Sequence, residues 1–340
     1  MSRVNGPDMV AVQTMRAYEI VATLGPSSAG QAIWQAMIAA GATAFRLNTS
    51  HLSLEQLDGW LANIDRFFRS TGVRLPLVLD LQGSKWRLGR FEPFELVEGE
   101  KIELVLAETS EQAGLLPVPH ADFFKAAPLS GSEVVLNDAK IRLNVETVTQ
   151  SSICAQILQG GWISSHKGIT YRASDFRVET ISEKDQAILE RVNRWGPIRL
   201  AVSYVKDSYE IEKYRARLGP AAYLIAKLER GPALEDAAII AALSDELWLC
   251  RGDLGAELGL KAMAVAVARF SKQVGQFQVP TLMAGQVLEH MTDQPVPTRS
   301  EVCYLYDTLA AGYRGFVLSD EAAVGRYPVE SCRVAALFKG

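Results

Sequence analysis

The sequence predicts an α/β fold in which eight parallel strands form a barrel and a small all-β domain is inserted after the third strand. Two observations lead to this prediction. Eight short apolar runs recur along the chain with amphipathic helical segments between them, a pattern typical of parallel βαβ units. The interval between the third and fourth runs is much longer than the others and is patterned differently. Eight βα units point to a (β/α)8 TIM barrel.

The eight apolar runs have the length and composition of buried strands. Helical segments such as QAIWQAMIAAG and LEQLDGWLANIDRFF stand between them, and these segments tend to end at a glycine or a polar turn before the next run. In chain order, the predicted strands span residues 19–25, 42–48, 75–81, 198–205, 222–229, 246–252, 279–285 and 314–320.

The long interval contains short segments of alternating polarity, such as FELVEGEKIELVLAE and EVVLNDAKIRLNVETV, with glycine, asparagine and aspartate at the turns. This pattern predicts an all-β insertion at the barrel end where active sites form, and we expect it to act as a lid. The predicted organisation is an N-terminal arm over 1–18, a barrel over 19–88 and 167–340, and an inserted lid domain over 89–166.

Composition narrows the class of protein. The 340 residues are 48% hydrophobic and carry a net charge of −4, so nothing suggests a nucleic-acid partner. No apolar run is long enough for a membrane helix, and the N-terminus lacks the apolar core of a signal peptide, so a cytoplasmic location is expected. The four cysteines are scattered without a CxxC pair, which argues against a zinc site and a disulfide framework.

Charged residues gather where the predicted strands end. Lys227 and Glu229 are two residues apart on one strand, so both side chains lie on the same face. Glu229 and Asp253, on neighbouring strands, could share Mg²⁺, which takes one or two protein carboxylates. Arg46, Arg87 and Lys227 are cations suited to phosphate. A salt bridge between Lys227 and Glu229, a helix cap at Asp253 and a surface ion pair at Arg46 remain simpler alternatives for the separate residues.

An ordered set of motifs makes the interpretation more specific. The segments IVATLGPSS, FRLNTSH, LVLDLQG, SSHKG, ISEKD, IAKLE, RGDLGAELG, PTRSE and LSDEAAVGRYPVE follow one another with compatible spacing, and the chain from about residue 19 to 340 resembles the pyruvate kinase family. Each motif alone is weak, and their order is specific. Members of this family transfer a phosphoryl group between phosphoenolpyruvate and ADP.

The resemblance implies a role for each matching residue. Glu229 and Asp253 would hold Mg²⁺ or Mn²⁺, and Lys227 would neutralise the transferred phosphoryl group together with Arg46 and Arg87. The remaining expected positions are Arg251, Gly252, Asp253, Gly285 and Ser319 for the substrate, Pro26, His51 and Lys167 for the nucleotide, and Asn48, Ser50, Asp80 and Lys85 for the monovalent-cation pocket.

One departure from the family pattern concerns potassium. Leu81, Gln82 and Lys85 stand where potassium-requiring members usually have threonine, lysine and glutamate. The ammonium group of Lys85 could supply the positive charge of a bound potassium ion, so we expect activity without added potassium. The simpler alternative is that Lys85 is an exposed loop residue.

A second departure lies at the end of the seventh predicted strand, where Gly285 replaces a threonine whose hydroxyl helps to deliver a proton to the enolate. Loss of a proton-delivery group typically costs about 10²- to 10⁴-fold in rate. Glycine is also expected to enlarge the pocket beside the reacting carbon. Nearby, Tyr304 and Asp307 replace an aspartate and an asparagine of the family pattern.

Three functions follow from these features. The leading one is a Mg²⁺-dependent phosphotransferase acting on phosphoenolpyruvate, or a close analogue, and ADP. The alternatives are a Mg²⁺-dependent lyase or aldolase that uses a pyruvate enolate, and an inactive homologue that binds phosphoenolpyruvate or nucleotide. The sequence ends after the eighth helical segment, so regulation through the family's C-terminal domain is not expected. Small molecules are the expected partners, and a homo-oligomer is left open.

Overall fold

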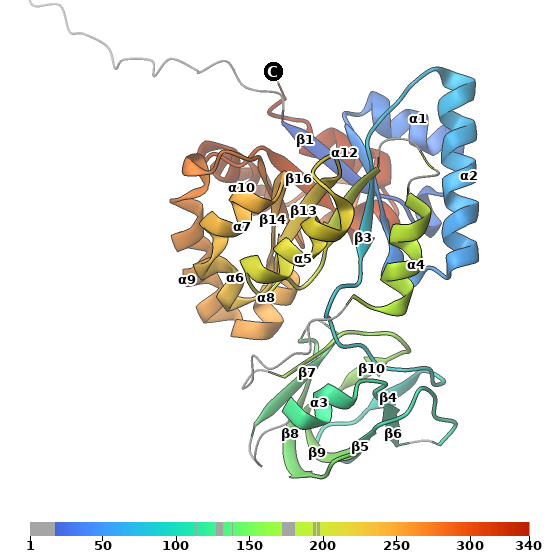
Figure 1. Cartoon of the computed structure of the whole chain (residues 1–340), viewed down its shortest axis with the longest axis vertical. Coiled ribbons are helices and arrows are strands. Elements are labelled where there is room, and N and C mark those ends of the chain that lie inside the picture. Colours follow the sequence, from blue (N-terminus) through green and yellow to red (C-terminus); the bar gives the residue numbers. More distant parts are fainter. Residues whose placement is uncertain are drawn as a thin grey trace, which may run out of the picture.

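A computed structural model describes residues 18–112, 114–126, 132–137, 139–171, 181–192, 195 and 198–339. Its central element is a closed barrel of eight parallel strands (Figure 1). The prediction of a (β/α)8 barrel is therefore confirmed, and each of the eight predicted runs contains one strand. Around the barrel these are β1 (Glu19–Thr23), β16 (Gly315–Leu318), β15 (Thr281–Ala284), β14 (Glu246–Cys250), β13 (Tyr223–Leu228), β12 (Ile198–Val202), β3 (Leu77–Leu81) and β2 (Ala44–Asn48).

Side-chain alternation along each strand separates the barrel interior from its outer wall. In β13, Leu224, Ala226 and Leu228 pack in the large core beneath the helices, whereas Ile225 belongs to the cluster inside the barrel. Lys227 and Glu229 follow Ile225 at intervals of two, so the same alternation directs them to the interior side, where the barrel opens. The mouth of the barrel thus receives charged side chains from a strand whose remaining residues are apolar or aromatic.

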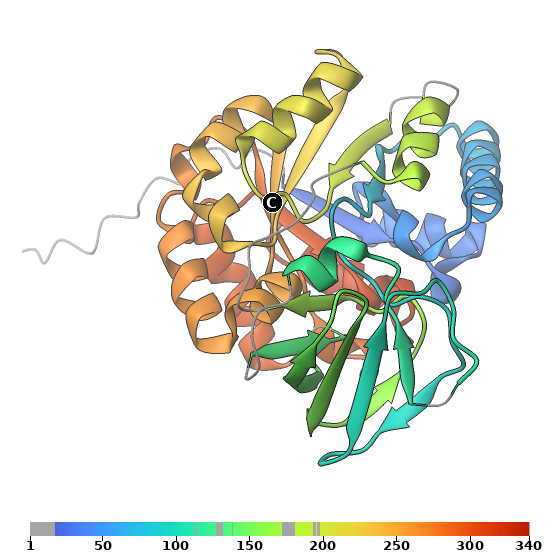
Figure 2. The same cartoon turned by 60° about the horizontal axis from the view of Figure 1, so that its bottom comes forward.

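Helices surround the strands, as Figure 2 shows. Local signals mark their ends: α2 begins with a capping box between Ser53 and Gln56 and ends at Gly72, whose φ is +71°. The helices of the barrel are α1 (Gln31–Ala39), α2 (Leu54–Thr71), α4 (Glu183–Val192), α5 (Ser208–Leu218), α6 (Gly231–Glu235), α7 (Ala237–Leu243), α8 (Arg251–Leu258), α9 (Leu260–Ser271), α10 (Arg299–Ala310), α11 (Asp320–Ala323) and α12 (Pro328–Ala335), with short 3-10 turns η1 (Pro26–Ser28), η2 (Thr49–His51), η3 (Val274–Gln276) and η4 (Glu289–Thr292).

The segment between β3 and α4 forms a separate β structure with its own apolar core, drawn below the barrel in Figure 1. One six-stranded sheet has the order β11-β7-β8-β9-β5-β6, and β10 pairs with β4. The sheet extends past residue 166, because its last strand ends at Tyr171. The elements are β4 (Phe94–Leu96), β5 (Lys101–Val105), β6 (Leu115–Pro117), α3 (Ala121–Ala126), β7 (Glu133–Leu136), β8 (Ile141–Val148), β9 (Ser152–Gln159), β10 (Gly161–Ile163) and β11 (Ile169–Tyr171).

Two expectations concern other parts of the chain. Residues 1–17 of the predicted N-terminal arm lie outside the described residues. Among the helices that the structure describes, none combines the length and the apolar character needed to cross a membrane.

Candidate active site

Buried polar side chains meet at the C-terminal ends of the barrel strands. Each of them is at most 8% exposed, which is unusual for charged residues and requires that they be paired. They come from five strand ends, those of β1, β2, β3, β12 and β13. The group consists of Thr23, Arg46, Asp80, Ser203, Lys227 and Glu229.

Asp80 accepts hydrogen bonds from three other members of this group. Its Oδ2 accepts hydrogen bonds from Arg46 Nε at 2.7 Å and Nη2 at 2.6 Å. Its Oδ1 accepts from Ser203 Oγ at 2.9 Å and from Lys227 Nζ at 3.1 Å. Burial alone would raise the pKa of Asp80, but Lys227 and Arg46 outweigh burial and lower it. Asp80 is therefore ionised and holds both cations in place.

Lys227 lies between two carboxylates. Its Nζ is 3.1 Å from Asp80 Oδ2 and 3.0 Å from Glu229 Oε1, and it also donates to Ser203 Oγ at 2.7 Å. Burial disfavours the ammonium form, yet Asp80 and Glu229 raise the pKa of Lys227 above its ordinary value. The salt bridge considered as the simpler alternative for Lys227 and Glu229 is present. It forms part of a larger buried network at the barrel mouth.

Asp253 is in the first turn of α8, next to the end of β14. Its Oδ1 accepts a hydrogen bond from Lys85 Nζ, and the two side chains form an ion pair. Burial raises the pKa of Asp253, but Lys85, with smaller contributions from Lys227 and Arg87, lowers it below its ordinary value. Lys85 is only 7% exposed, and its ammonium end packs against Gly168, which follows the insertion's β10. The alternative of an exposed loop lysine is therefore wrong.

The metal-ligand set at this mouth is small. Within the described residues, no group of three or more histidine, cysteine, aspartate or glutamate side chains could hold a metal ion. Glu229 and Asp253 remain as a pair of hard oxygen donors. Such a pair fits Mg²⁺, which completes its shell with substrate oxygens and water, and does not fit zinc, which takes three or four protein ligands.

The first turn of α8 packs against the loop that follows β15. Gly285 has φ of +80°, and a β-carbon built there would lie 2.9 Å from the backbone nitrogen of Gly252. Arg251 fastens this contact: its Nη2 donates to Gly285 O and Gln286 O, both at 2.8 Å. The guanidinium group also lies 4.4 Å from the ring centre of Tyr304. The expected enlargement of the pocket at Gly285 is therefore wrong, because glycine here permits a close backbone approach.

The sequence has relatives among known proteins. A sequence model described as "Pyruvate kinase, barrel domain" matches residues 15–332. The chain belongs to the pyruvate kinase family. The pyruvate kinase of Aeropyrum pernix is 32% identical over 317 residues, which cover 92% of this chain and 68% of that protein. Those of Thermococcus litoralis and Methylorubrum extorquens are 29% and 32% identical, covering 94% and 93% of this chain and 68% and 66% of theirs.

Of the residues that the pyruvate kinase resemblance assigns to the nucleotide, His51 and Lys167 lie near each other and near Arg87. The pKa of His51 is lowered by partial desolvation and by four cations, Arg87, Lys167, Arg46 and Lys85. Four cations thus lie around His51, and such a concentration of positive charge favours an anion. Arg87 is fixed where the chain enters the insertion, because its Nη1 donates to His166 O at 3.0 Å. Pro26 begins η1, which packs against α11 through Gly25.

The residues assigned to the monovalent-cation pocket divide into two groups. Asn48 Oδ1 accepts from Ser50 N at 3.2 Å within η2, and Thr49 Oγ1 donates to Asp80 O at 2.8 Å. The Asp80 carboxylate itself is occupied by Arg46, Lys227 and Ser203. Lys85 instead forms its ion pair with Asp253, at the start of α8. Ser319, assigned to the substrate, donates its backbone N–H to Glu321 Oε2 at 2.9 Å.

Several residues that shape the site were not predicted from the sequence. The Asp185 carboxylate accepts the N–H groups of Gln82 at 3.2 Å and Gly83 at 2.9 Å, and thereby fixes the loop that carries Lys85. The available signal was the ISEKD motif, which contains Asp185 but gave no indication of its target. Tyr204 is also new: its backbone N–H donates to Glu229 Oε2 at 2.6 Å.

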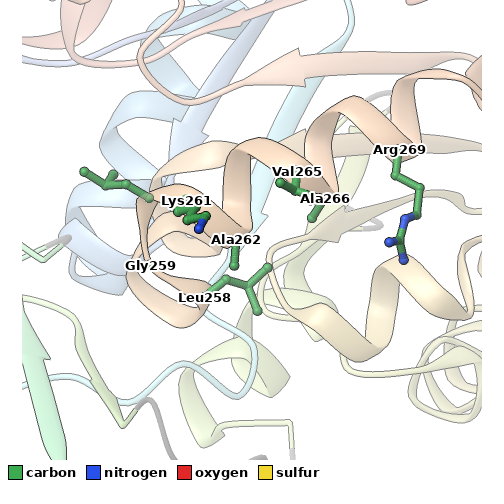
Figure 3. Close-up of a pocket in the computed structure, with 8 residues that line it drawn as sticks. Leu258, Gly259, Lys261, Ala262, Val265, Ala266 and Arg269 are labelled. Atoms are coloured by element: carbon green, nitrogen blue, oxygen red, sulfur yellow. The ribbon is translucent and has the colours of Figure 1, made fainter.

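A surface depression lies along α9 and involves none of the predicted site residues (Figure 3). Its walls mix aliphatic side chains with two cations, as the sticks in Figure 3 show. Leu260 and Val265 in this region are 78% and 55% exposed. The lining residues are Leu258, Gly259, Leu260, Lys261, Ala262, Val265, Ala266 and Arg269.

Proposed function

We propose that this chain is a Mg²⁺-dependent phosphotransferase that moves a phosphoryl group between phosphoenolpyruvate, or a close analogue, and ADP. The observation that carries the proposal is the convergence at one barrel mouth of buried cations and of two hard carboxylates. Phosphoryl transfer needs positioning and charge neutralisation more than covalent chemistry. Membership of the pyruvate kinase family supports this class of reaction.

The cations act on the transferred group. Lys227 is protonated and held at its Nζ by Asp80, Glu229 and Ser203, so it meets the phosphoryl group without a reorganisation cost. Arg46 is oriented by Asp80 and by Thr23, whose Oγ1 accepts from Arg46 Nη1 at 2.7 Å. Arg87 binds phosphate oxygens from the side of the insertion.

Glu229 and Asp253 would hold Mg²⁺, or Mn²⁺ in its place. When bound, this ion supplies positive charge for the phosphoryl oxygens. The backbone N–H groups of Arg251, Gly252 and Asp253 begin a helix, where the partial positive charge favours an anion such as the substrate carboxylate. Gly285 and Ser319 complete the substrate side, and Pro26, His51 and Lys167 complete the nucleotide side.

Lys85 makes added potassium unnecessary in this proposal. Its ammonium group is buried beside Asp253 and is held there by an ion pair. A tethered cation at this position replaces the charge that a bound potassium ion would contribute. The insertion, which joins the barrel next to Lys85 and Arg87, acts as the lid that excludes water during transfer.

The absence of a side chain at Gly285 supports a second function. An enolate formed at this mouth would meet no hydroxyl group from residue 285, so its protonation would be slow. An enolate that persists can attack a carbonyl carbon, as in an aldolase. In a lyase, the enolate would be formed by loss of CO₂ from the substrate. A third possibility is a protein that only binds phosphoenolpyruvate or nucleotide.

One assay separates these functions. The protein is incubated with phosphoenolpyruvate, ADP and MgCl₂, and ATP is measured with luciferase. Turnover by the wild type, and a loss of about 10²- to 10³-fold in Lys227→Met, is expected for the phosphotransferase. No ATP formation would contradict that function. Consumption of pyruvate with an aldehyde acceptor would then favour the aldolase, and binding of phosphoenolpyruvate without turnover would favour the inactive homologue.

A further inference from the structure

Tyr204 has a backbone conformation that is rare for a residue with a side chain. It follows β12, is fully buried and has φ of +64°, in the left-handed region. A bulky residue remains in this conformation only where surrounding contacts determine it, and such positions cluster at functional sites. The contacts of Tyr204 therefore indicate what the conformation is for.

The main chain of Tyr204 contacts the proposed metal side of the mouth. Its N–H donates to Glu229 Oε2 at 2.6 Å, while Lys227 contacts the other oxygen, Oε1. Its carbonyl accepts from Ser84 Oγ at 3.4 Å, next to Lys85 in the chain. The backbone of Tyr204 and the ammonium group of Lys227 together hold the Glu229 carboxylate, one on each oxygen.

The side chain of Tyr204 points to a second group of buried charges. Its hydroxyl donates to Glu257 Oε2 at 2.6 Å. The Arg230 guanidinium lies 5.3 Å from the centre of its ring, and Arg230 Nε is 3.9 Å from Glu257 Oε1. Arg230 is fully buried and Glu257 is 8% exposed. These three residues form the Tyr204–Arg230–Glu257 cluster.

The cluster joins the elements that carry the two proposed metal ligands. Arg230 follows Glu229 directly at the end of β13. Glu257 comes four residues after Asp253 on α8, so both side chains lie on the same side of that helix. Tyr204 holds Glu229 through its N–H and holds α8 through its hydroxyl. The distance between Glu229 and Asp253 is therefore linked to the Tyr204 hydroxyl through contacts at both ends.

Packing alone does not account for these residue types. A buried arginine–glutamate pair loses its hydration, and apolar residues of similar volume often stabilise a core as well or better. A charged pair with a hydroxyl donor has directional bonds, which apolar residues lack. Residues behind metal ligands that orient them in this way typically change metal affinity about 10- to 100-fold when they are removed.

We propose that Tyr204 is a positioning residue for the divalent cation, and that its hydroxyl bond to Glu257 sets the separation of Glu229 and Asp253. The inference rests on the proposed function, in which these two carboxylates hold the ion. Residues that act through ligands without touching the ion are expected to alter the binding constant of the ion more than the binding of a substrate phosphate.

The test is a titration of the whole chain with Mn²⁺. The electron paramagnetic resonance signal of free Mn²⁺ measures how much of the ion is bound. Tyr204→Phe is compared with wild type, and Tyr18→Phe is the matched control, since Tyr18 is also buried and its hydroxyl donates to Ala335 O at 2.9 Å. Circular dichroism confirms that each variant is folded at the temperature of the titration. Tyr204→Phe should weaken Mn²⁺ binding about tenfold, whereas Tyr18→Phe should leave it unchanged.

Equal Mn²⁺ affinity in Tyr204→Phe and wild type would overturn the positioning role while leaving the metal site intact. Equal loss of affinity in both phenylalanine variants would also overturn it, because the effect would then be a general loss of stability. Wild-type protein that binds no Mn²⁺, or binding that survives Asp253→Asn, would overturn the metal site and the positioning role together. These outcomes distinguish failure of the inference from failure of the proposed function.

Discussion

Gly285 approaches Gly252 so closely that a β-carbon on Gly285 would lie 2.9 Å from the Gly252 nitrogen. Real β-carbons essentially never come so near another heavy atom, and the neighbour here is backbone. The φ of +80° at Gly285 disfavours a side chain independently of space. The loop after β15 and the first turn of α8 are therefore adapted to glycine, so a threonine cannot simply be restored.

Gly285→Thr is accordingly expected to destabilise the fold by about 2–4 kcal/mol and to leave ATP formation no faster. The measurement is urea unfolding together with the luciferase assay. Gly59→Ala is the matched control, because Gly59 lies in α2 with no atom near its missing β-carbon, and alanine should stabilise the helix by about 0.5–1 kcal/mol. Faster turnover in stable Gly285→Thr protein would contradict this account.

Activity is expected without potassium. Lys85 already places an ammonium group against Asp253, so replacing potassium chloride by tetramethylammonium chloride should change the rate less than about twofold. Lys85→Met removes this charge and leaves Asp253 without that partner, and its activity should fall and then recover in part when potassium is added. A wild type that is inactive until potassium is supplied would show that Lys85 does not replace the ion.

The sequence was sufficient to predict the strands of the barrel, the β segment after the third strand and several polar residues that the structure gathers at the strand ends. Alternation along β13 places Lys227 and Glu229 on the interior side independently of the neighbouring strands. The side of these two residues can therefore be predicted from the local sequence alone. The partners of these residues depend on distances between elements far apart in the chain. Neither the Lys85–Asp253 contact nor the bond from Tyr204 N–H to Glu229 has a local pattern, and both were missed.

The conformation at Gly285 shows a different limit of sequence reasoning. The sequence shows glycine where the family pattern has threonine, and this difference suggested extra space beside the reacting carbon. Whether a missing side chain leaves a cavity or a close contact depends on the backbone around it. Here Arg251 draws the Gly285–Gln286 loop against α8 through two carbonyl groups, and the space is filled by backbone.

Asp185 is expected to support the mouth from α4. Its carboxylate accepts the N–H groups of Gln82 and Gly83, so Asp185→Ala leaves two donors without that acceptor and should cost about 2–4 kcal/mol of stability. Because the same loop carries Lys85, the variant should also become stimulated by potassium. Asp185→Asn keeps one acceptor oxygen and should lose less on both measures. Loss of stability without potassium stimulation would limit Asp185 to a structural role.

The opposite end of the barrel predicts a pH dependence of stability. Glu246 is fully buried, and it accepts bonds from Trp248 Nε1 at 2.5 Å and Tyr223 OH at 2.9 Å. Burial, and then the charge of Glu19, raise the pKa of Glu246 from 4.5 to about 7. The folded protein therefore binds this proton more tightly than the unfolded chain does. Its contribution to stability is complete below about pH 4.5 and is lost as the pH rises through about 7.

Wild-type protein should therefore lose up to about 3 kcal/mol of unfolding free energy from this group between pH 4.5 and pH 8. Glu246→Gln cannot titrate, so its unfolding free energy should fall less steeply over the same range. Glu321 is buried with its pKa also raised to about 7, so a residual slope of the same sign is expected. Urea unfolding at several pH values measures the slopes, with the exposed Glu98→Gln as the control. Parallel slopes for wild type and Glu246→Gln would show that Glu246 is ionised in the folded barrel at neutral pH, with Arg199, 3.3 Å from its Oε2, as the compensating charge.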